Sequence, residues 1–268
     1  AYDASDTEND NLAIGHQAMT TNTAGGTKNI AIGNYSLDAL TSGDYNVAVG
    51  YNALTANTTA EGNTAIGYTA LEDNTTGTSN VAVGAYALAN STTAAGNVAV
   101  GVSALQTNTT GATNVAVGKD AMVLSTTGVN NVSIGSISLA ANTTGSRNTA
   151  IGAESMNDNT TADNNTAIGY ASLSKNTTGT SNTALGWAAL EVNTTASNNI
   201  AVGHAALRSN TTGTRLIAIG YAALDGQDTE NDNIAIGYNT MTTNNAGGEA
   251  NVVMGSYAGD AITSGDRN

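Results

Sequence analysis

The sequence contains no cysteine, no proline and no phenylalanine, and it has a single tryptophan. Without cysteine, disulfide bonds and thiolate metal sites are excluded. Without phenylalanine, the apolar residues are mainly alanine, valine, isoleucine and leucine, so we do not expect a deep globular core. Lys and Arg number 7 against 21 Asp and Glu, which gives a formal net charge of −14. This balance disfavours nucleic acids and anionic lipid surfaces as partners, because both bind clustered basic residues.

Long apolar runs are missing as well. No stretch approaches the roughly 20 apolar residues that a helix needs to cross a bilayer, so we expect no membrane insertion.

The sequence does contain a repeat of about seventeen residues. Each copy ends its central block with a glycine, and the intervals between these glycines are 18, then twelve times 17, then 18. The glycines are Gly15, Gly33, Gly50, Gly67, Gly84, Gly101, Gly118, Gly135, Gly152, Gly169, Gly186, Gly203, Gly220, Gly237 and Gly255. Such constant spacing indicates a solenoid in which each copy forms one coil.

The block before each glycine is typical of a β-strand. Residues 97–101 read Asn-Val-Ala-Val-Gly, which is β-branched and alternates large with small side chains. A second apolar pair follows, such as Ala104-Leu105, and a segment such as residues 108–111 (Asn-Thr-Thr-Gly) closes the coil. We therefore predict an all-β fold, a parallel β-solenoid or β-roll of about fifteen 17-residue coils with two short strands in each coil.

Side-chain alternation along a strand predicts which residues face the core. We expect the large residues, such as Val81 and Val83, to point inward and the alanine between them, Ala82, to point outward. This outer column is small and apolar except at Ser133 and Val253. It needs a cover, which is either a second layer of the same chain or, as we favour, a partner chain.

Asparagines recur at two positions of the coil. One opens fourteen of the fifteen blocks, with Leu216 as the exception, and stacked copies are expected to form a hydrogen-bonded ladder. A second begins the "NTT" segments at Asn57, Asn74 and Asn108, which match the acceptor pattern for N-glycosylation. A sugar in every coil would be crowded at a rise of about 4.8 Å per coil.

A longer period lies behind the short one. Residues 6–26 reappear almost unchanged at 228–248, at an offset of 222 residues, and the chain begins and stops inside the pattern. We interpret residues 1–268 as a single continuous β-solenoid region. We expect it to be a segment of a longer repetitive chain, or else a subunit that stacks end to end.

The motifs resemble those of a known family. Residues 97–105 (NVAVGVSAL) and 63–71 (NTAIGYTAL) are similar to the head repeats of trimeric autotransporter adhesins and to repeats of phage and bacterial fibres, and the similarity covers the whole chain. The resemblance implies a parallel β-roll, three chains packed into a trimeric fibre, and a location outside the cell or on a virion. The coils here are longer than usual for such heads, with Ala-Leu and "NTTG" in place of a small-residue pair.

Few side chains in the sequence are of the kinds used for catalysis or metal binding. His16 and His204 lie eleven coils apart and cannot share a site within one chain, so we expect neither an enzyme nor a cofactor. The acidic segments suggest one metal hypothesis, a calcium site formed by alternating carboxylates, against the alternative of a solvated turn. The candidate ligands are Asp6, Glu8, Asp10, Asp228, Glu230 and Asp232.

Aromatic residues recur directly after the repeat glycine and form a candidate ligand-binding row. Its members are Tyr51, Tyr68, Tyr170, Trp187, Tyr221 and Tyr238, with His16 and His204 in the same column. Exposed rings in a row can bind surface glycans, whereas the alternative is that they cover an apolar edge or a neighbouring chain.

Three functions are compatible with these patterns. The first is a structural repeat of an extracellular fibre or adhesin shaft, on a cell surface or virion, whose partners are copies of itself. The second is a module that binds glycans or another surface. The third, ice binding through recurring Thr-Thr pairs such as Thr58-Thr59, is weakened because adjacent side chains point to opposite sides of a strand.

Overall fold

The computed structural model describes residues 10–22, 25–226, 229–242, 248–260, 262 and 265–267. It has two compact units, Ala1–Asn131 and Val132–Asn268. Each unit is a parallel β-solenoid, and the described residues contain strands and turns but no helix. The predicted all-β solenoid with one coil about every 17 residues is therefore confirmed.

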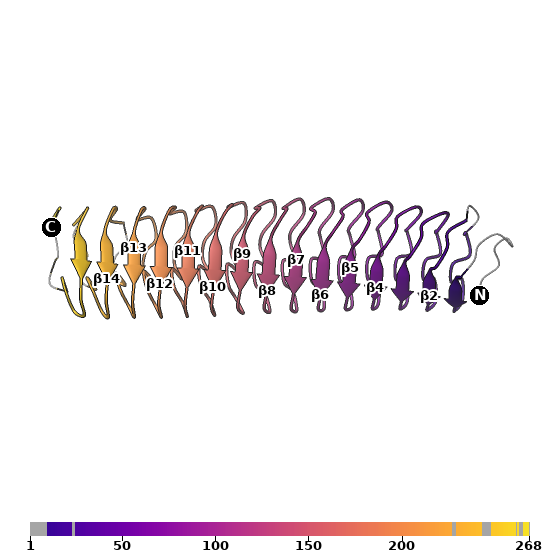
Figure 1. The fold of residues 1–268 in the computed structure, drawn as a ribbon, viewed down its shortest axis with the longest axis horizontal. Helices are drawn as coiled ribbons and strands as arrows, with labels where there is room; N and C mark the ends of the chain where they lie inside the picture. The colour runs from indigo at the N-terminus through magenta and orange to yellow at the C-terminus, as the bar shows by residue number, and fades with distance from the viewer. Residues whose placement is uncertain are drawn as a thin grey trace. The chain divides into compact units, whose positions relative to one another are not determined.

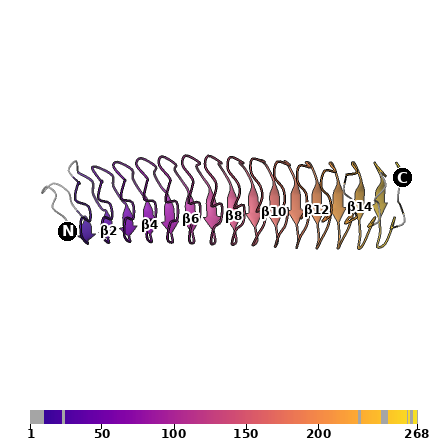
Figure 2. The same cartoon turned by 180° about the vertical axis from the view of Figure 1, so that it is seen from behind.

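The strands are three residues long and lie side by side in chain order within each unit (Figures 1 and 2). In the first unit they are β1 (Leu12–Ile14), β2 (Ile30–Ile32), β3 (Val47–Val49), β4 (Thr64–Ile66), β5 (Val81–Val83), β6 (Val98–Val100) and β7 (Val115–Val117). In the second unit they are β8 (Val132–Ile134), β9 (Thr149–Ile151), β10 (Thr166–Ile168), β11 (Thr183–Leu185), β12 (Ile200–Val202), β13 (Ile217–Ile219), β14 (Ile234–Ile236) and β15 (Val252–Met254). Pairing places equivalent residues side by side, as for Ala82 and Ala99.

The prediction of two strands per coil is wrong for the described residues, which contain one strand in each coil. Where "AL" indicated a second strand, the chain forms a run of turns with left-handed backbones at alternate residues, as at Asn52 (φ 54°) and Leu54 (φ 53°). This run still joins the coils. Asn52 N–H donates to the carbonyl of Asn34 in the preceding coil (3.1 Å), and Leu54 N–H donates to that of Ala70 in the next (3.0 Å). A left-handed leucine is uncommon, so strand propensity misled the sequence interpretation here.

The two faces of each strand are reversed relative to the prediction. Ala82 is fully buried, whereas Val81 and Val83 are partly exposed, and the middle residue is the most buried of the three in every described strand. The interior is narrow because the turn run lies close opposite the strand. The leucine of the turn run, such as Leu88, is fully buried and occupies this interior, so the inward strand position holds a small residue and the large β-branched residues lie outside.

Two substitutions show how close the opposing walls are. At the middle of β8, the Ser133 hydroxyl donates to the carbonyl of Ser138 across the interior at 2.8 Å and also contacts the Ser138 hydroxyl. At the middle of β15, the larger Val253 is accommodated because Gly259 replaces the usual leucine. A Cβ on Gly259 would lie 2.9 Å from Val253 Cγ1. A larger residue at the strand position is thus compensated by a smaller residue at the facing position of the turn run.

The asparagine that opens each block forms the predicted ladder. Asn63 Oδ1 accepts the backbone N–H of Asn80 (2.9 Å) and its Nδ2 group (3.2 Å), and Asn80 Nδ2 also donates to the Ala94 carbonyl (2.8 Å). The side chain therefore bonds the preceding coil and closes its own coil. At the exception, Leu216 keeps only the backbone bond, from its N–H to Asn199 Oδ1 at 2.9 Å.

The asparagine of the "NTT" segment forms a second buried ladder. In the second unit it runs unbroken through Asn142, Asn159, Asn176, Asn193 and Asn210, with Nδ2···Oδ1 distances of 2.9–3.0 Å between neighbouring coils. Each Nδ2 group also donates to a carbonyl three residues later in its own coil. Since these side chains are fully buried, the folded coil has no space for an N-linked sugar on them.

The 222-residue repeat is reproduced in three dimensions, with each bond formed inside its own unit. Asn11 Nδ2 donates to the Gly26 carbonyl at 2.7 Å, and its counterpart Asn233 donates to the Gly248 carbonyl at 2.7 Å. The side-chain bond of Thr20 to Asp38 likewise recurs. Its counterpart joins Thr242 to Asp260. Segments that repeat in sequence therefore fold in the same way.

Candidate functional site

The outer face of the strands is a uniform surface that runs along each unit. Every outward strand position holds Val, Ile, Leu, Thr or Met, so this strand face carries no charge. Large apolar side chains on it are well exposed, as for Ile66 (40%), Leu185 (44%) and Ile219 (38%). Because paired strands are in register, these side chains form two straight columns along each unit. From the sequence we had predicted that this apolar face points inward, and that the alanines form the outer face that a second layer or a partner chain covers.

The strand faces of the two units differ slightly in composition. The three consecutive strands β5, β6 and β7 present only valine. The strands β9, β10 and β11 present threonine in the first column and isoleucine or leucine in the second. Threonine and valine have the same shape, so both surfaces are ridged in the same way.

A ladder of aromatic rings lies on the second unit, in the column directly after the repeat glycine. Trp187 stacks on His204 with ring centroids 4.5 Å apart and an interplanar angle of 15°. His204 stacks on Tyr221 at 5.0 Å, and Tyr221 stacks on Tyr238 at 5.1 Å. Since the coil spacing is close to the separation of stacked rings, the solenoid positions them face to face.

A second ladder, in which only one of the described ring pairs is stacked in parallel, lies on the first unit. Tyr51 and Tyr68 stack with centroids 5.6 Å apart and an interplanar angle of 11°. Tyr35 contacts Tyr51, and Tyr86 contacts Tyr68, both in edge-to-face geometry at 5.6 and 5.3 Å. His16 packs edge-to-face on Tyr35 at 5.4 Å.

The sequence interpretation located most rings of both ladders but missed three. Tyr35, Tyr86 and Tyr257 belong to the column two residues after the glycine, and each packs edge-to-face on a ring of the neighbouring coil. Left-handed backbones at these residues (φ 57–61°) accompany their packing against the first column. Only this unusual backbone brings two sequence columns into one ladder.

Tyr170 belongs to the predicted row, but no ring contact joins it to either ladder within the described residues. Its phenol lies beside the Glu154 carboxylate. The negative charge of Glu154 disfavours a phenolate, so it raises the pKa of Tyr170, and desolvation and a hydrogen bond between the two side chains act in the same direction.

Ring stacking limits what the ladders can bind. In Trp187, His204, Tyr221 and Tyr238 the faces are turned toward one another, while the side chains remain exposed at their edges. A sugar ring stacks on an aromatic face, and within the ladder these faces are already occupied.

The calcium hypothesis is only partly covered by the described residues. Asp6, Glu8 and Asp228 lie outside them. Of the other candidates, Asp10 is exposed, Glu230 is largely buried and accepts the backbone N–H of Thr229 (3.1 Å), and Asp232 binds a cation of the chain itself. In the part of the chain that the structure describes, no three His, Cys, Asp or Glu side chains are grouped to hold a metal ion.

Asp232 pairs with Arg215 of the preceding coil. Arg215 Nε donates to Asp232 Oδ1 (2.6 Å) and Nη2 donates to Oδ2 (2.8 Å). This hydrogen bonding lowers the pKa of Asp232 and raises that of Arg215.

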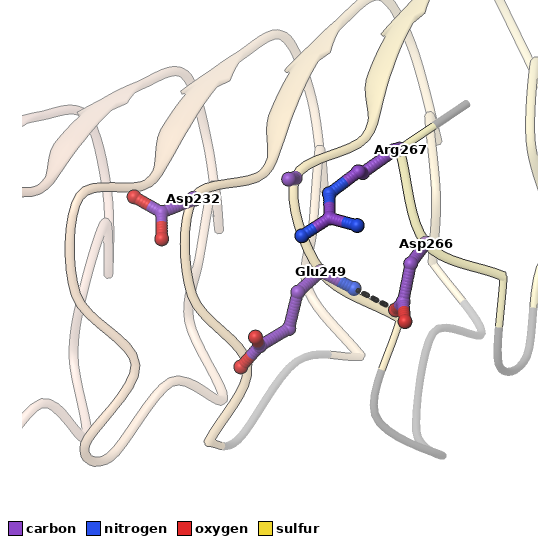
Figure 3. Close-up of a pocket in the computed structure, with 5 residues that line it drawn as sticks. Asp232, Glu249, Asp266 and Arg267 are labelled. Carbon is purple, nitrogen blue, oxygen red and sulfur yellow. Dashed lines mark hydrogen bonds between the residues drawn. The ribbon is translucent and has the colours of Figure 1, made fainter.

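A small open pocket of about 160 Å³ lies in the second unit (Figure 3). It is lined by Asp232, Glu249, Ala250, Asp266 and Arg267. Asp266 Oδ1 accepts the backbone N–H of Glu249 at 2.9 Å, drawn as a dashed line, and Asp232 is bound by Arg215. In the first unit, Asp44 likewise accepts the N–H of Thr27 at 2.7 Å. The carboxylates of the pocket thus join coils, as their counterparts do elsewhere.

No protein-family model, no curated protein and no solved structure matches the chain. Among the described residues, there is no helix long and apolar enough to cross a membrane.

Proposed function

We propose that this chain is a structural repeat of an extracellular fibre or adhesin shaft, and that copies of it associate through the outer faces of their strands. The observation that supports the proposal is the strand face, which is continuous along each unit, carries no charge and is apolar except for threonines in the first column. Monomeric soluble proteins rarely expose a large apolar patch, and such a patch usually marks an interface.

The chemistry of the face favours a second copy as its partner. The chain has a formal net charge of −14, so identical chains repel one another overall, and a surface without charge adds least to this repulsion when two copies meet. Each copy also carries the same columns at the same coil spacing, so two faces can match coil for coil. The resemblance to trimeric adhesin heads leads us to expect three chains.

Oligomeric state after substitution on the strand face tests this proposal. We expect the purified chain to sediment as an oligomer, and Val98→Asp combined with Val115→Asp to shift it toward the monomer. Both valines point outward from β6 and β7, so the coils themselves should still form. Analytical ultracentrifugation gives the mass, and circular dichroism checks the fold.

Val102→Asp is the control, and it is compared with Val98→Asp alone so that each variant adds one charge. Val102 is 47% exposed but follows β6, outside the strand face, so the same substitution there should leave the oligomer intact. A wild-type chain that is monomeric at all concentrations would contradict the proposed association. Equal dissociation by the control would also contradict it, since charge alone would then be responsible.

Glycan binding is the alternative function, and among the described residues the aromatic ladders are the surface that suits it best. The stacked faces weaken it, because only ring edges and the ends of each ladder are available. A glycan array with hits that disappear in Trp187→Ala would favour this alternative.

Ice binding receives little support from the Thr-Thr pairs. The first threonine uses its hydroxyl within the fold, as Thr75 Oγ1 donates to the Thr92 carbonyl at 3.0 Å, which leaves one exposed threonine per pair. An absence of thermal hysteresis would exclude ice binding.

A further inference from the structure

Two pairs of tyrosines occupy equivalent positions in neighbouring coils and stack in parallel. Tyr221 and Tyr238 lie in the second unit, with ring centroids 5.1 Å apart and planes inclined by 14°. Tyr51 and Tyr68 lie in the first unit, at 5.6 Å and 11°. All four side chains are between 44% and 49% exposed, so a solvent-borne reagent can reach them.

The solenoid positions the reactive atoms of each pair in register. Both tyrosines of a pair directly follow a repeat glycine, so their side chains leave equivalent points of neighbouring coils. Because the planes are nearly parallel and the side chains leave equivalent points, we expect the ring carbons beside the two hydroxyls to lie on the same side of the stack. Exposed side chains change rotamer within picoseconds to nanoseconds, so small rotations can bring these carbons into contact.

We propose that the stacked pairs Tyr221–Tyr238 and Tyr51–Tyr68 are sites of oxidative cross-linking to dityrosine. A haem peroxidase using hydrogen peroxide removes one electron and the hydroxyl proton from each phenol, which leaves two phenoxyl radicals. A carbon–carbon bond then forms between the two ring carbons ortho to the oxygens. The hydrogens on those carbons move to the oxygens and restore both phenols. The two electrons and two protons removed reduce one peroxide molecule to two water molecules.

The cross-link would supply what the sequence lacks. The chain has no cysteine, so no disulfide can join its coils. A dityrosine between Tyr221 and Tyr238 would join consecutive coils covalently and close a short loop, as a disulfide does. It would therefore oppose the local separation of coils.

Other tyrosines provide internal comparisons. Tyr45 binds Lys28 Nζ through its hydroxyl at 3.3 Å, and Tyr170 lies beside Glu154; neither has a ring contact with another tyrosine among the described residues. The pair Tyr68–Tyr86 has a similar centroid distance, 5.3 Å, but an interplanar angle of 73°. Comparing the cross-linking yield of this pair with that of the parallel pairs separates the effect of ring orientation from that of ring distance.

The test is peroxidase treatment of the folded chain at high dilution, followed by peptide mapping with mass spectrometry. We expect cross-linked peptides for Tyr221–Tyr238 and Tyr51–Tyr68, each lacking two hydrogen atoms, together with dityrosine fluorescence. Tyr238→Phe should abolish the first cross-link and leave the second, and Tyr68→Phe should do the reverse. Both variants keep the stacked ring, so folding should be preserved. Tyr170→Phe should leave both cross-links unchanged.

A mixture of isotope-labelled and unlabelled chains distinguishes links within a chain from links between chains. Cross-links found only between chains would overturn the proposal. So would stacked pairs that react no more often than Tyr45 and Tyr170, or a pattern that is the same in the urea-unfolded chain.

Discussion

The two units have the same coil but differ in one buried column. In the second unit, the asparagine ladder of the "NTT" segments continues from Asn142 to Asn210 without a break. In the first unit, Leu40, Ser91 and Ser125 interrupt this column. Asn74 Oδ1 and Asn108 Oδ1 have no hydrogen-bond partner among the described residues, and neither does Asn210 Oδ1 at the end of the run in the second unit.

The difference shows which interactions the coil requires. A serine is too short to reach the next coil, and yet β5, β6 and β7 pair like all the others. The opening asparagine of the interrupted coil still closes it, since Asn80 Nδ2 donates to the Ala94 carbonyl. One interrupted ladder is therefore tolerated because the strand pairing and the other ladder remain, at a local cost in free energy.

The largest effect is expected at the repeat glycine, which both units share. Gly84 (φ 138°) and Gly186 (φ 140°) have backbones that disfavour other residues, and an added Cβ would lie 2.5 and 2.3 Å from the carbonyl oxygen of the next repeat glycine. We expect Gly84→Ala and Gly186→Ala each to lower the free energy of unfolding by about 3 kcal/mol or more. Urea unfolding followed by circular dichroism measures this.

Gly62→Ala is the control for the repeat glycines. An added Cβ at Gly62 meets only the Ser79 hydroxyl at 3.8 Å, and Ser79 itself occupies the equivalent position with φ 59°. Because Gly62 has a left-handed backbone (φ 68°) but open space around it, this substitution should cost only about 1 kcal/mol, clearly less than at the repeat glycines. If Gly84→Ala and Gly186→Ala lowered the free energy of unfolding by different amounts, the two units would differ in more than the asparagine column.

Asn176→Ser introduces the interruption of the first unit into the second. It removes the donor to Asn159 Oδ1 and the acceptor for Asn193 Nδ2, so one buried oxygen loses its partner. We expect a loss of about 1–3 kcal/mol in local stability, seen as faster amide hydrogen exchange in the coils around β10 and β11. The neighbouring exposed Thr178→Ser should leave exchange unchanged, and an unchanged rate in Asn176→Ser would contradict a stabilising role for the ladder.

Ser91→Asn should repair the ladder in the first unit. The coil with Asn57 and Ala60 already combines an asparagine with a closing alanine, as Ser91→Asn would do beside Ala94. We expect a gain of about 1 kcal/mol, because the new amide can bond both Asn74 and Asn108. Slower hydrogen exchange around β5 and β6 would show it. Ser79→Asn makes the same change on the surface and should leave the stability unchanged. If Ser91→Asn instead lowered the stability, the interior around residue 91 would be too small for asparagine.

The smallest effect is expected from a surface ion pair. Asp232 has a lowered pKa, so its pairing with Arg215 contributes stability above the usual carboxyl pKa and loses it as the pH falls through the lowered value. Arg215→Gln should raise the pKa of Asp232 toward its usual range with little change in stability, because both side chains are exposed. An NMR titration measures this, and Arg208→Gln should leave Asp232 unchanged.

The period and the opening asparagine could be predicted because each depends on one local pattern. Constant spacing of the glycines means coils of constant circumference, and an asparagine recurring at one position can bond its own copies. The orientation of the strands could not be predicted in this way. The alternation in Val81-Ala82-Val83 is compatible with either the valines or the alanine pointing inward. Which of them points inward depends on how close the turn run lies to the strand.

In the aromatic ladders, too, some residues could be predicted from the sequence and others could not. Tyr51, Tyr68, Tyr221 and Tyr238 share one column and were found from spacing alone. Tyr35, Tyr86 and Tyr257 come from the next column, and the left-handed backbone that accompanies their packing on the first has no signature that propensity can detect. For the same reason the "AL" segments were mistaken for strands.

By itself, then, the sequence determined the number and length of the coils, their all-β character and the identity of the side chains that stack, because translation along a solenoid repeats whatever one coil contains. The tertiary structure decided which face of the strand is inside. A coil closed by a single short strand and a tight turn run has a narrow interior, which is filled by the buried asparagines, the alanines and the leucine or methionine of the turn run. The valines and isoleucines are therefore left on the surface.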